Sequence, residues 1–132
     1  MMPVMPVRIV RLGEPREQGE GLRIGTVRRP PRGVPRSEFA GRDFYDTWLP
    51  ELAPSQELVT RALHAETERE WSAFVRDYRK EMATPQARHL LELVAALSHQ
   101  TNVAVGCYCQ DEARCHRSVL RGLLADHGAD LA

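Results

Sequence analysis

The sequence predicts a single compact α/β domain in which a small, mainly parallel sheet is flanked by helices. Two short β-branched segments come early in the chain, helical patterns fill its middle, and a third β-branched segment precedes a final helix. A chain of 132 residues has the usual size of one domain with its own hydrophobic core. We therefore expect one domain over residues 1–132.

The composition is that of an ordinary globular protein. Hydrophobic residues make up 42% of the chain and charged residues 27%, which argues against disorder. No apolar run reaches the roughly 18 residues of a membrane span, and the first residues lack the apolar core of a secretory signal. Three cysteines are too few, and odd in number, for a disulfide framework. We expect a cytoplasmic protein with reduced thiols and no membrane contact.

The first two strands are expected near the N-terminus. Residues 7–12 (VRIVRL) alternate apolar residues with arginine, which is the period of a half-buried strand, and residues 22–27 (LRIGTV) form a second candidate. Pro30 and Pro31 then prevent any regular element. We expect residues 37–54 to be irregular, with at most one short helical turn.

Three helices are expected in the second half of the chain, followed by a strand and a last helix. Ser55 is placed to cap the first, Thr67 and Glu70 form a capping box for the second, and Pro85 occupies the first turn of the third. The second helix carries an apolar stripe at helical spacing, formed by Trp71, Phe74, Val75, Tyr78 and Met82. Residues 101–108 (TNVAVGCY) predict a buried central strand, and residues 118–128 a final helix.

The segment CYCQDEARCHR (107–117) holds all three cysteines and lies between this strand and the last helix. Ligands of open α/β sheets bind outside the carboxyl ends of the strands, and the free N–H groups of a helix N-terminus favour an anion. The segment is therefore the predicted functional site.

One interpretation of the site is a reactive thiolate formed by Cys109 or Cys115, with His116 as base or orienting group. Cys109 is followed five residues later by Arg114, which is similar to the loop of rhodanese-type sulfurtransferases and one residue shorter than that of cysteine phosphatases. Asp111 and Glu112 argue against an anion in the loop, unless they cap the helix.

Three other interpretations remain open. The sulfurs of Cys107, Cys109 and Cys115 with the ring of His116 make a ligand set for zinc or iron, although their spacing strains a tetrahedral site. Cys115 can also resolve one of the other cysteines in a thiol–disulfide switch. Finally, the cysteines can be small apolar residues of the core.

Arginines are the candidate anion-binding residues. Residues 1–36 carry eight arginines and three glutamates, and the chain as a whole has no net charge. We expect Arg28, Arg29 and Arg32 to face Arg114 and Arg117 across one pocket, with Tyr45 at its rim. An arginine block can also meet the backbone of a nucleic acid. The chain has 17 arginines and one lysine, which points to a general preference for arginine and weakens this inference.

Several segments resemble a known family. PRGV (31–34), WLPELAPS (48–55) and the strand before the cysteines are similar to the YeaO-like branch of domain-of-unknown-function family 488, whose members are small bacterial or archaeal α/β domains, most without an established activity. Where that branch has an aspartate at the end of the second strand, this chain has Val27. Cys115–Arg117 (CHR) is instead similar to a motif of the wider family.

The predicted function is thiol-dependent chemistry or sensing on an anionic small molecule or nucleotide. The alternative is a metal-binding or nucleic-acid-associated module without catalysis, with zinc or iron as the metal. The sequence leaves enzymatic activity and oligomeric state undecided.

Overall fold

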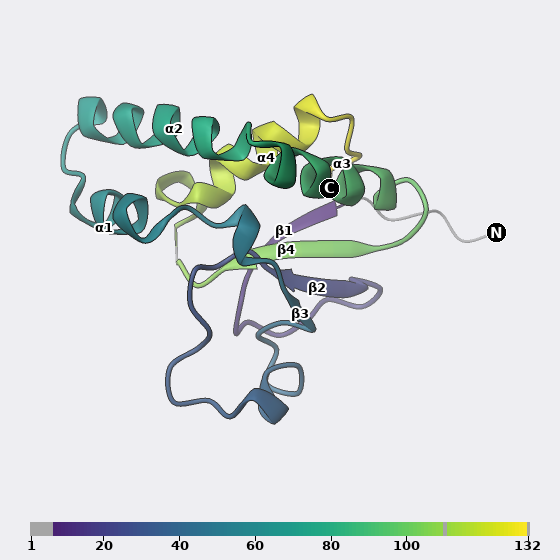
Figure 1. The fold of residues 1–132 in the computed structure, drawn as a ribbon. Helices are drawn as coiled ribbons and strands as arrows, with labels where there is room; N and C mark the ends of the chain where they lie inside the picture. The colour runs from purple at the N-terminus through teal and green to yellow at the C-terminus, as the bar shows by residue number, and fades with distance from the viewer. Residues whose placement is uncertain (1–6, 110, 132) are drawn as a thin grey trace.

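A computed structural model, which describes residues 7–109 and 111–131, contains one four-stranded parallel sheet (Figure 1). The strands are β1 (Val7–Arg11), β2 (Leu22–Gly25), β3 (Thr47–Trp48) and β4 (Val103–Cys107), in the order β1-β4-β2-β3. Every pair of neighbours is parallel, and β4 is buried along its whole length. The predicted fold class and the central position of the last strand are therefore confirmed. The two-residue β3, inside a segment predicted to be irregular, was not expected.

The helices begin close to where the capping residues predicted. They are α1 (Gln56–His64), α2 (Glu68–Met82), α3 (Pro85–Leu97) and α4 (His116–Asp126), with short 3-10 turns η1 (Arg36–Glu38), η2 (Pro50–Leu52) and η3 (Glu112–Arg114). The Ser55 side chain accepts a hydrogen bond from Leu58 N, and Thr67 and Glu70 form the capping box. In the described residues, no helix is both long and apolar enough to cross a bilayer.

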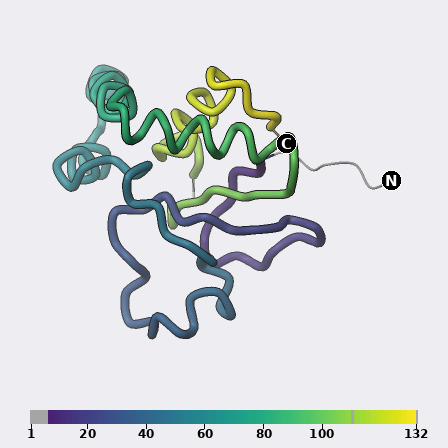
Figure 2. Tube along the Cα trace, turned by 45° about the vertical axis from the view of Figure 1, so that its right-hand side comes forward, coloured from purple at the N-terminus to yellow at the C-terminus, as the bar shows by residue number. Residues whose placement is uncertain are grey.

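All four α-helices lie on one face of the sheet (Figures 1 and 2). Their buried side chains form one hydrophobic cluster with the strand residues that point to this face, which include Val7, Ile24, Val103 and Val105. Alternate residues of a strand point to opposite faces, so the odd-numbered residues of β4 face the helices. Cys107 is the last residue of that set, which brings the sulfur-bearing end of β4 beneath the helical layer.

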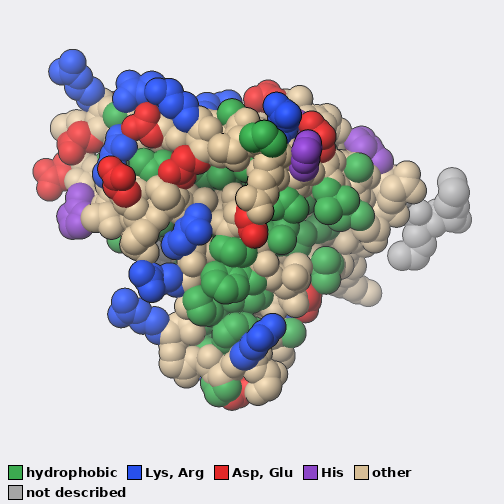
Figure 3. Space-filling model, in the orientation of Figure 1, with side chains coloured by type: hydrophobic (Ala, Val, Ile, Leu, Met, Phe, Trp, Pro, Cys, Tyr) green, Lys and Arg blue, Asp and Glu red, His purple; other side chains and the backbone are tan. Residues whose placement is uncertain are grey.

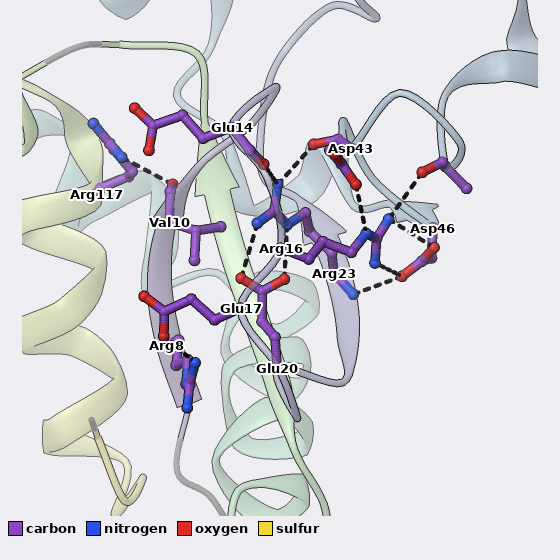
Figure 4. Close-up of polar contacts among 11 residues, drawn as sticks. Arg8, Val10, Glu14, Arg16, Glu17, Glu20, Arg23, Asp43, Asp46 and Arg117 are labelled. Atoms are coloured by element: carbon purple, nitrogen blue, oxygen red, sulfur yellow. Dashed lines mark hydrogen bonds and ion pairs between the residues drawn. The ribbon is translucent and has the colours of Figure 1, made fainter.

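Loops cover the opposite face of the sheet, and a polar network fixes them (Figure 4). Arg23 is fully buried: it pairs with Glu20 at 2.8 Å and donates to the backbone oxygens of Glu14 and Asp43. The Arg16 guanidinium binds the carboxylates of Asp43 and Asp46. Two loops that are distant in the sequence are thereby tied to β2.

The sheet glycines allow this loop layer to approach closely. A Cβ at Gly25 would lie 2.3 Å from the Tyr45 ring, and one at Gly106 would lie 2.7 Å from the Leu12 side chain. The aromatic ring and the leucine therefore pack directly on the sheet backbone. A second apolar cluster includes residues from both sides of the sheet, and it contains Leu12, Val27, Tyr45, Cys107 and Cys115.

Candidate functional site

Three cysteine sulfurs converge where β4 ends and α4 begins. Cys107 closes the strand, Cys115 is the N-cap residue of α4, and the intervening loop returns Cys109 to both of them. The three Sγ atoms lie within 4.8 Å of one another, and those of Cys107 and Cys109 are 3.7 Å apart. Cys107 and Cys115 are buried, whereas Cys109 is partly exposed. Cys109 is thus the sulfur that a ligand can reach first.

The His116 ring is held by the end of β2. Its Nε2 lies 2.7 Å from the Thr26 carbonyl oxygen, which can only accept, so Nε2 carries the proton. The other nitrogen, Nδ1, lies 3.7 Å from the Cys115 sulfur. The ligand atoms that lie mutually within 4.8 Å are the three sulfurs without His116. In this geometry the histidine contacts the sulfur cluster through Cys115.

The three thiols have unequal proton affinities. Hydrogen bonding to Cys109, then to Cys115, together with burial, raises the pKa of the Cys107 thiol. Hydrogen bonds from Cys107 and Cys115 outweigh burial at Cys109 and, with the positive charge of Arg117, lower the pKa of its thiol to about 3. A hydrogen bond from Cys107 is also the largest cause that lowers the pKa of Cys115. Within the cluster, protonation is therefore favoured at Cys107 and ionisation at Cys109.

A pocket of about 310 Å³ opens over the sulfurs. Four of the predicted anion-binding residues line it: Arg28, Arg29, Arg32 and Arg114. The pairing of β2 with β4 brings the first three to the cysteines, because both strands end at the same edge. Among the described residues, none that lines the pocket is acidic. Figure 3 shows several Lys and Arg side chains on the left of the molecule, with Asp and Glu side chains on the helical layer above them.

The two acidic residues of the cysteine loop bind protein groups that do not line the pocket. An Asp111 carboxylate oxygen accepts a hydrogen bond from Ala113 N at 3.0 Å, which caps η3. Glu112 makes a two-pronged ion pair with Arg121 at 2.9 and 3.0 Å. Asp111 thus caps the 3-10 turn η3 and not the final helix, for which the sequence suggested it, and neither carboxylate lines the pocket. The electrostatic argument against an anion in the pocket is therefore removed.

Two predicted site residues are not brought to the pocket. Arg117 is buried, and its two terminal nitrogens donate to the carbonyl oxygens of Val10 (2.8 Å) and Cys109 (2.5 Å), so it supports the loop from behind. Tyr45 lies against Gly25 and lines a different hollow, beside Arg36 and Trp48. Both positions depend on which face of the sheet a loop covers, which local sequence patterns do not specify.

Sequence reasoning missed one wall of the pocket. Val59, Ala62 and Leu63 of α1, with Phe74 of α2, also line it. The Tyr78 hydroxyl donates to the Leu52 carbonyl oxygen at 2.6 Å, and its ring meets the His116 ring edge-on, with centroids 5.7 Å apart. Phe74 and Tyr78 belong to the apolar stripe that the sequence predicted as core. The structure shows in addition that Phe74 lines the pocket and that Tyr78 packs against the His116 ring.

Comparison with known proteins identifies the family. The sequence model DUF488-N3a, described as an active DUF488-N3 subclade, matches residues 7–128. The chain belongs to the DUF488 family. The matched range contains the whole pocket and the sulfur cluster of this DUF488 member. The match does not decide the YeaO-like branch, which stays a prediction. No curated protein and no solved structure matches the chain.

The structure gives the CHR segment of this DUF488 protein a physical meaning. Cys115 caps α4 and completes the sulfur cluster, His116 joins that cluster to the end of β2, and Arg117 joins it to β1. Three consecutive side chains thereby fix one loop to two strands. The cysteines form a group that can hold a metal ion.

Proposed function

We propose that the protein carries out thiol-dependent chemistry on an anionic small molecule, with the Cys109 thiolate as nucleophile. The observation that carries the proposal is the position of Cys109. It is the most accessible of three converging sulfurs, and the described residues that line its pocket include four arginines and no carboxylate. A thiolate is the nucleophilic form of cysteine, and fixed positive charges attract an anionic substrate. The description of the matched subclade as active is consistent with catalysis.

The neighbouring groups have separate roles in this proposal. The Cys109 sulfur attacks an electrophilic centre of the substrate, a new bond to sulfur forms, and the leaving group departs with the electron pair of the broken bond. Cys107 lies 3.7 Å from the attacking sulfur and, through its hydrogen bond, favours the thiolate form of Cys109. His116 positions Cys115, and Arg117 positions the Cys109 peptide.

The test is selective alkylation. Iodoacetamide at about pH 6 should label Cys109 faster than the other two cysteines and much faster than a free cysteine peptide, whose thiol is almost fully protonated there. Peptide mass spectrometry locates the label, and Cys109→Ser is the matched control that should remove it. Slow labelling of all three cysteines at this pH would overturn the proposal.

Metal binding is the second candidate, and the sulfur geometry favours it. A Zn–S bond of about 2.3 Å in a tetrahedral site separates two sulfurs by about 3.8 Å, and Cys107 and Cys109 are 3.7 Å apart. Cys107, Cys109 and Cys115 would hold zinc or iron, and the metal would supply Lewis-acid chemistry at the pocket.

Metal analysis separates the two candidates. A metal site predicts about one equivalent of zinc or iron in the purified protein and a lower melting temperature after chelation. Bound metal would also protect all three cysteines from iodoacetamide until it is removed. Metal-free protein with a fast-reacting Cys109 supports the thiolate, and stoichiometric metal with protected sulfurs supports the metal site.

A further inference from the structure

We infer that the ligand of this pocket is a small aliphatic anion, a carboxylate or phosphate with an apolar tail, rather than a nucleotide. The inference depends on the proposed function, because it assigns a substrate class to the pocket over Cys109. It follows from the composition of two groups of lining side chains, one apolar and one basic, which we call the two walls.

The first wall is apolar, and one of its residues, Leu63, is highly exposed. Val59, Ala62 and Leu63 of α1 line the pocket together with Phe74. Leu63 is 74% exposed, the highest value among the large exposed hydrophobic residues of the described chain. An exposed leucine is unremarkable when it stands alone, but this one continues an apolar pocket wall. A bound alkyl group would remove this surface from water.

The second wall supplies positive charge in fixed positions. The Arg28 guanidinium donates to the carbonyl oxygens of Pro54 (2.9 Å) and Ala53 (3.1 Å), which hold it beside η2 without neutralising it. Arg29 is likewise bound by a neutral partner, the Gln56 side chain, at 3.0 Å. Arg114 differs, because it pairs with Glu68 and lies over the Trp71 ring. The net charge at the rim therefore comes mainly from residues 28–32.

A nucleotide fits these walls less well. Recognition of a base requires donors and acceptors along its edge. The α1 side of the pocket offers one amide, Gln56, which already accepts from Arg29, and its other lining side chains are apolar. A volume of about 310 Å³ also lies at the lower end of the range for small-molecule sites. A single anionic group with a short tail matches both the charge and the apolar surface.

Octanoate is the probe for the experiment. Protection of Cys109 from iodoacetamide is measured with octanoate, acetate, octan-1-ol and adenosine monophosphate. We expect octanoate to protect at concentrations at least tenfold lower than acetate, which lacks the tail, and than octanol, which lacks the charge. Equal protection by octanoate and acetate, or stronger protection by the nucleotide, would overturn the inference.

Matched variants test whether the apolar wall causes the preference for octanoate over acetate. Leu63→Asp should abolish the advantage of octanoate over acetate, whereas Leu93→Asp, at a 53% exposed position on α3, should leave it unchanged. The shift of the melting temperature by octanoate is a second readout that needs no reactive thiol. A reactive Cys109 without octanoate preference refutes only the inference. An octanoate-dependent shift with an unreactive Cys109 refutes only the nucleophile.

Discussion

The carbonyl oxygen of Thr26 accepts a hydrogen bond from Nε2 of His116, and the 2.7 Å contact connects the end of β2 with the start of α4. Both groups are buried. The contact fixes the tautomer of the histidine and leaves Nδ1 facing the Cys115 sulfur. The same hydrogen bond therefore stabilises the fold and orients the His116 ring beside the sulfur cluster.

Removal of this hydrogen bond should destabilise the protein. His116→Ala leaves the Thr26 carbonyl oxygen buried without its partner, and we expect a loss of about 1–3 kcal/mol in the free energy of unfolding. Urea denaturation followed by circular dichroism measures the change. His89→Ala, at an exposed position of α3, is the control and should change the stability little. An unchanged midpoint in His116→Ala would show that the contact contributes nothing.

The Cys107 thiol should control the reactivity of Cys109. Because Cys107 is the first cause of the lowered Cys109 pKa, Cys107→Ala should raise that pKa from about 3 toward the ordinary thiol value. Alkylation of Cys109 should then slow at least tenfold at about pH 6 and stay unchanged above about pH 10, where any thiol is ionised. The pH profile of the rate tests this directly. Cys107→Ser keeps a donor and should retain more of the wild-type rate.

Peroxide should join two of the cysteines. The Cys109 thiolate attacks hydrogen peroxide, which gives a sulfenic acid and releases water after proton transfer, and the Cys107 thiol then displaces a second water to form a disulfide. Their sulfurs are already 3.7 Å apart. Intact mass should fall by two hydrogens, and a reductant should reverse the change. Cys115→Ser should still form this bond, and a disulfide that requires Cys115 would contradict the expectation.

An ion pair in the loop layer should make the stability of the protein fall at acid pH. Burial alone would raise the pKa of Asp46, but hydrogen bonds from Arg16 and from the Arg23 backbone outweigh it and lower the pKa. A lowered pKa contributes stability that is present above the unfolded value and is lost as pH falls through the folded one. Asp46→Asn should thus cost about 1–2 kcal/mol near neutral pH and less in acid. Unfolding curves across pH measure it, with Asp126→Asn, an exposed pair, as control.

Local patterns predicted the elements well because their signals are local. The capping box at Thr67 and the proline at Pro85 placed two helix starts, and the β-branched residues 103–105 placed the central strand. Local patterns did not predict which segments cover each face of the sheet. Arg117 and Tyr45 were expected at the pocket, yet which face a loop covers is decided by contacts between segments far apart in the sequence.

The sulfurs and the walls of the pocket come from different parts of the chain. The end of β4 and the start of α4 carry the cysteines, whereas residues 28–32 and α1 supply other lining residues of the pocket. Selection can therefore act on the two parts separately. Relatives that keep the sulfur cluster but differ in α1 would then be specialised for other ligands, and exchange of α1 between them is a direct route to altered selectivity.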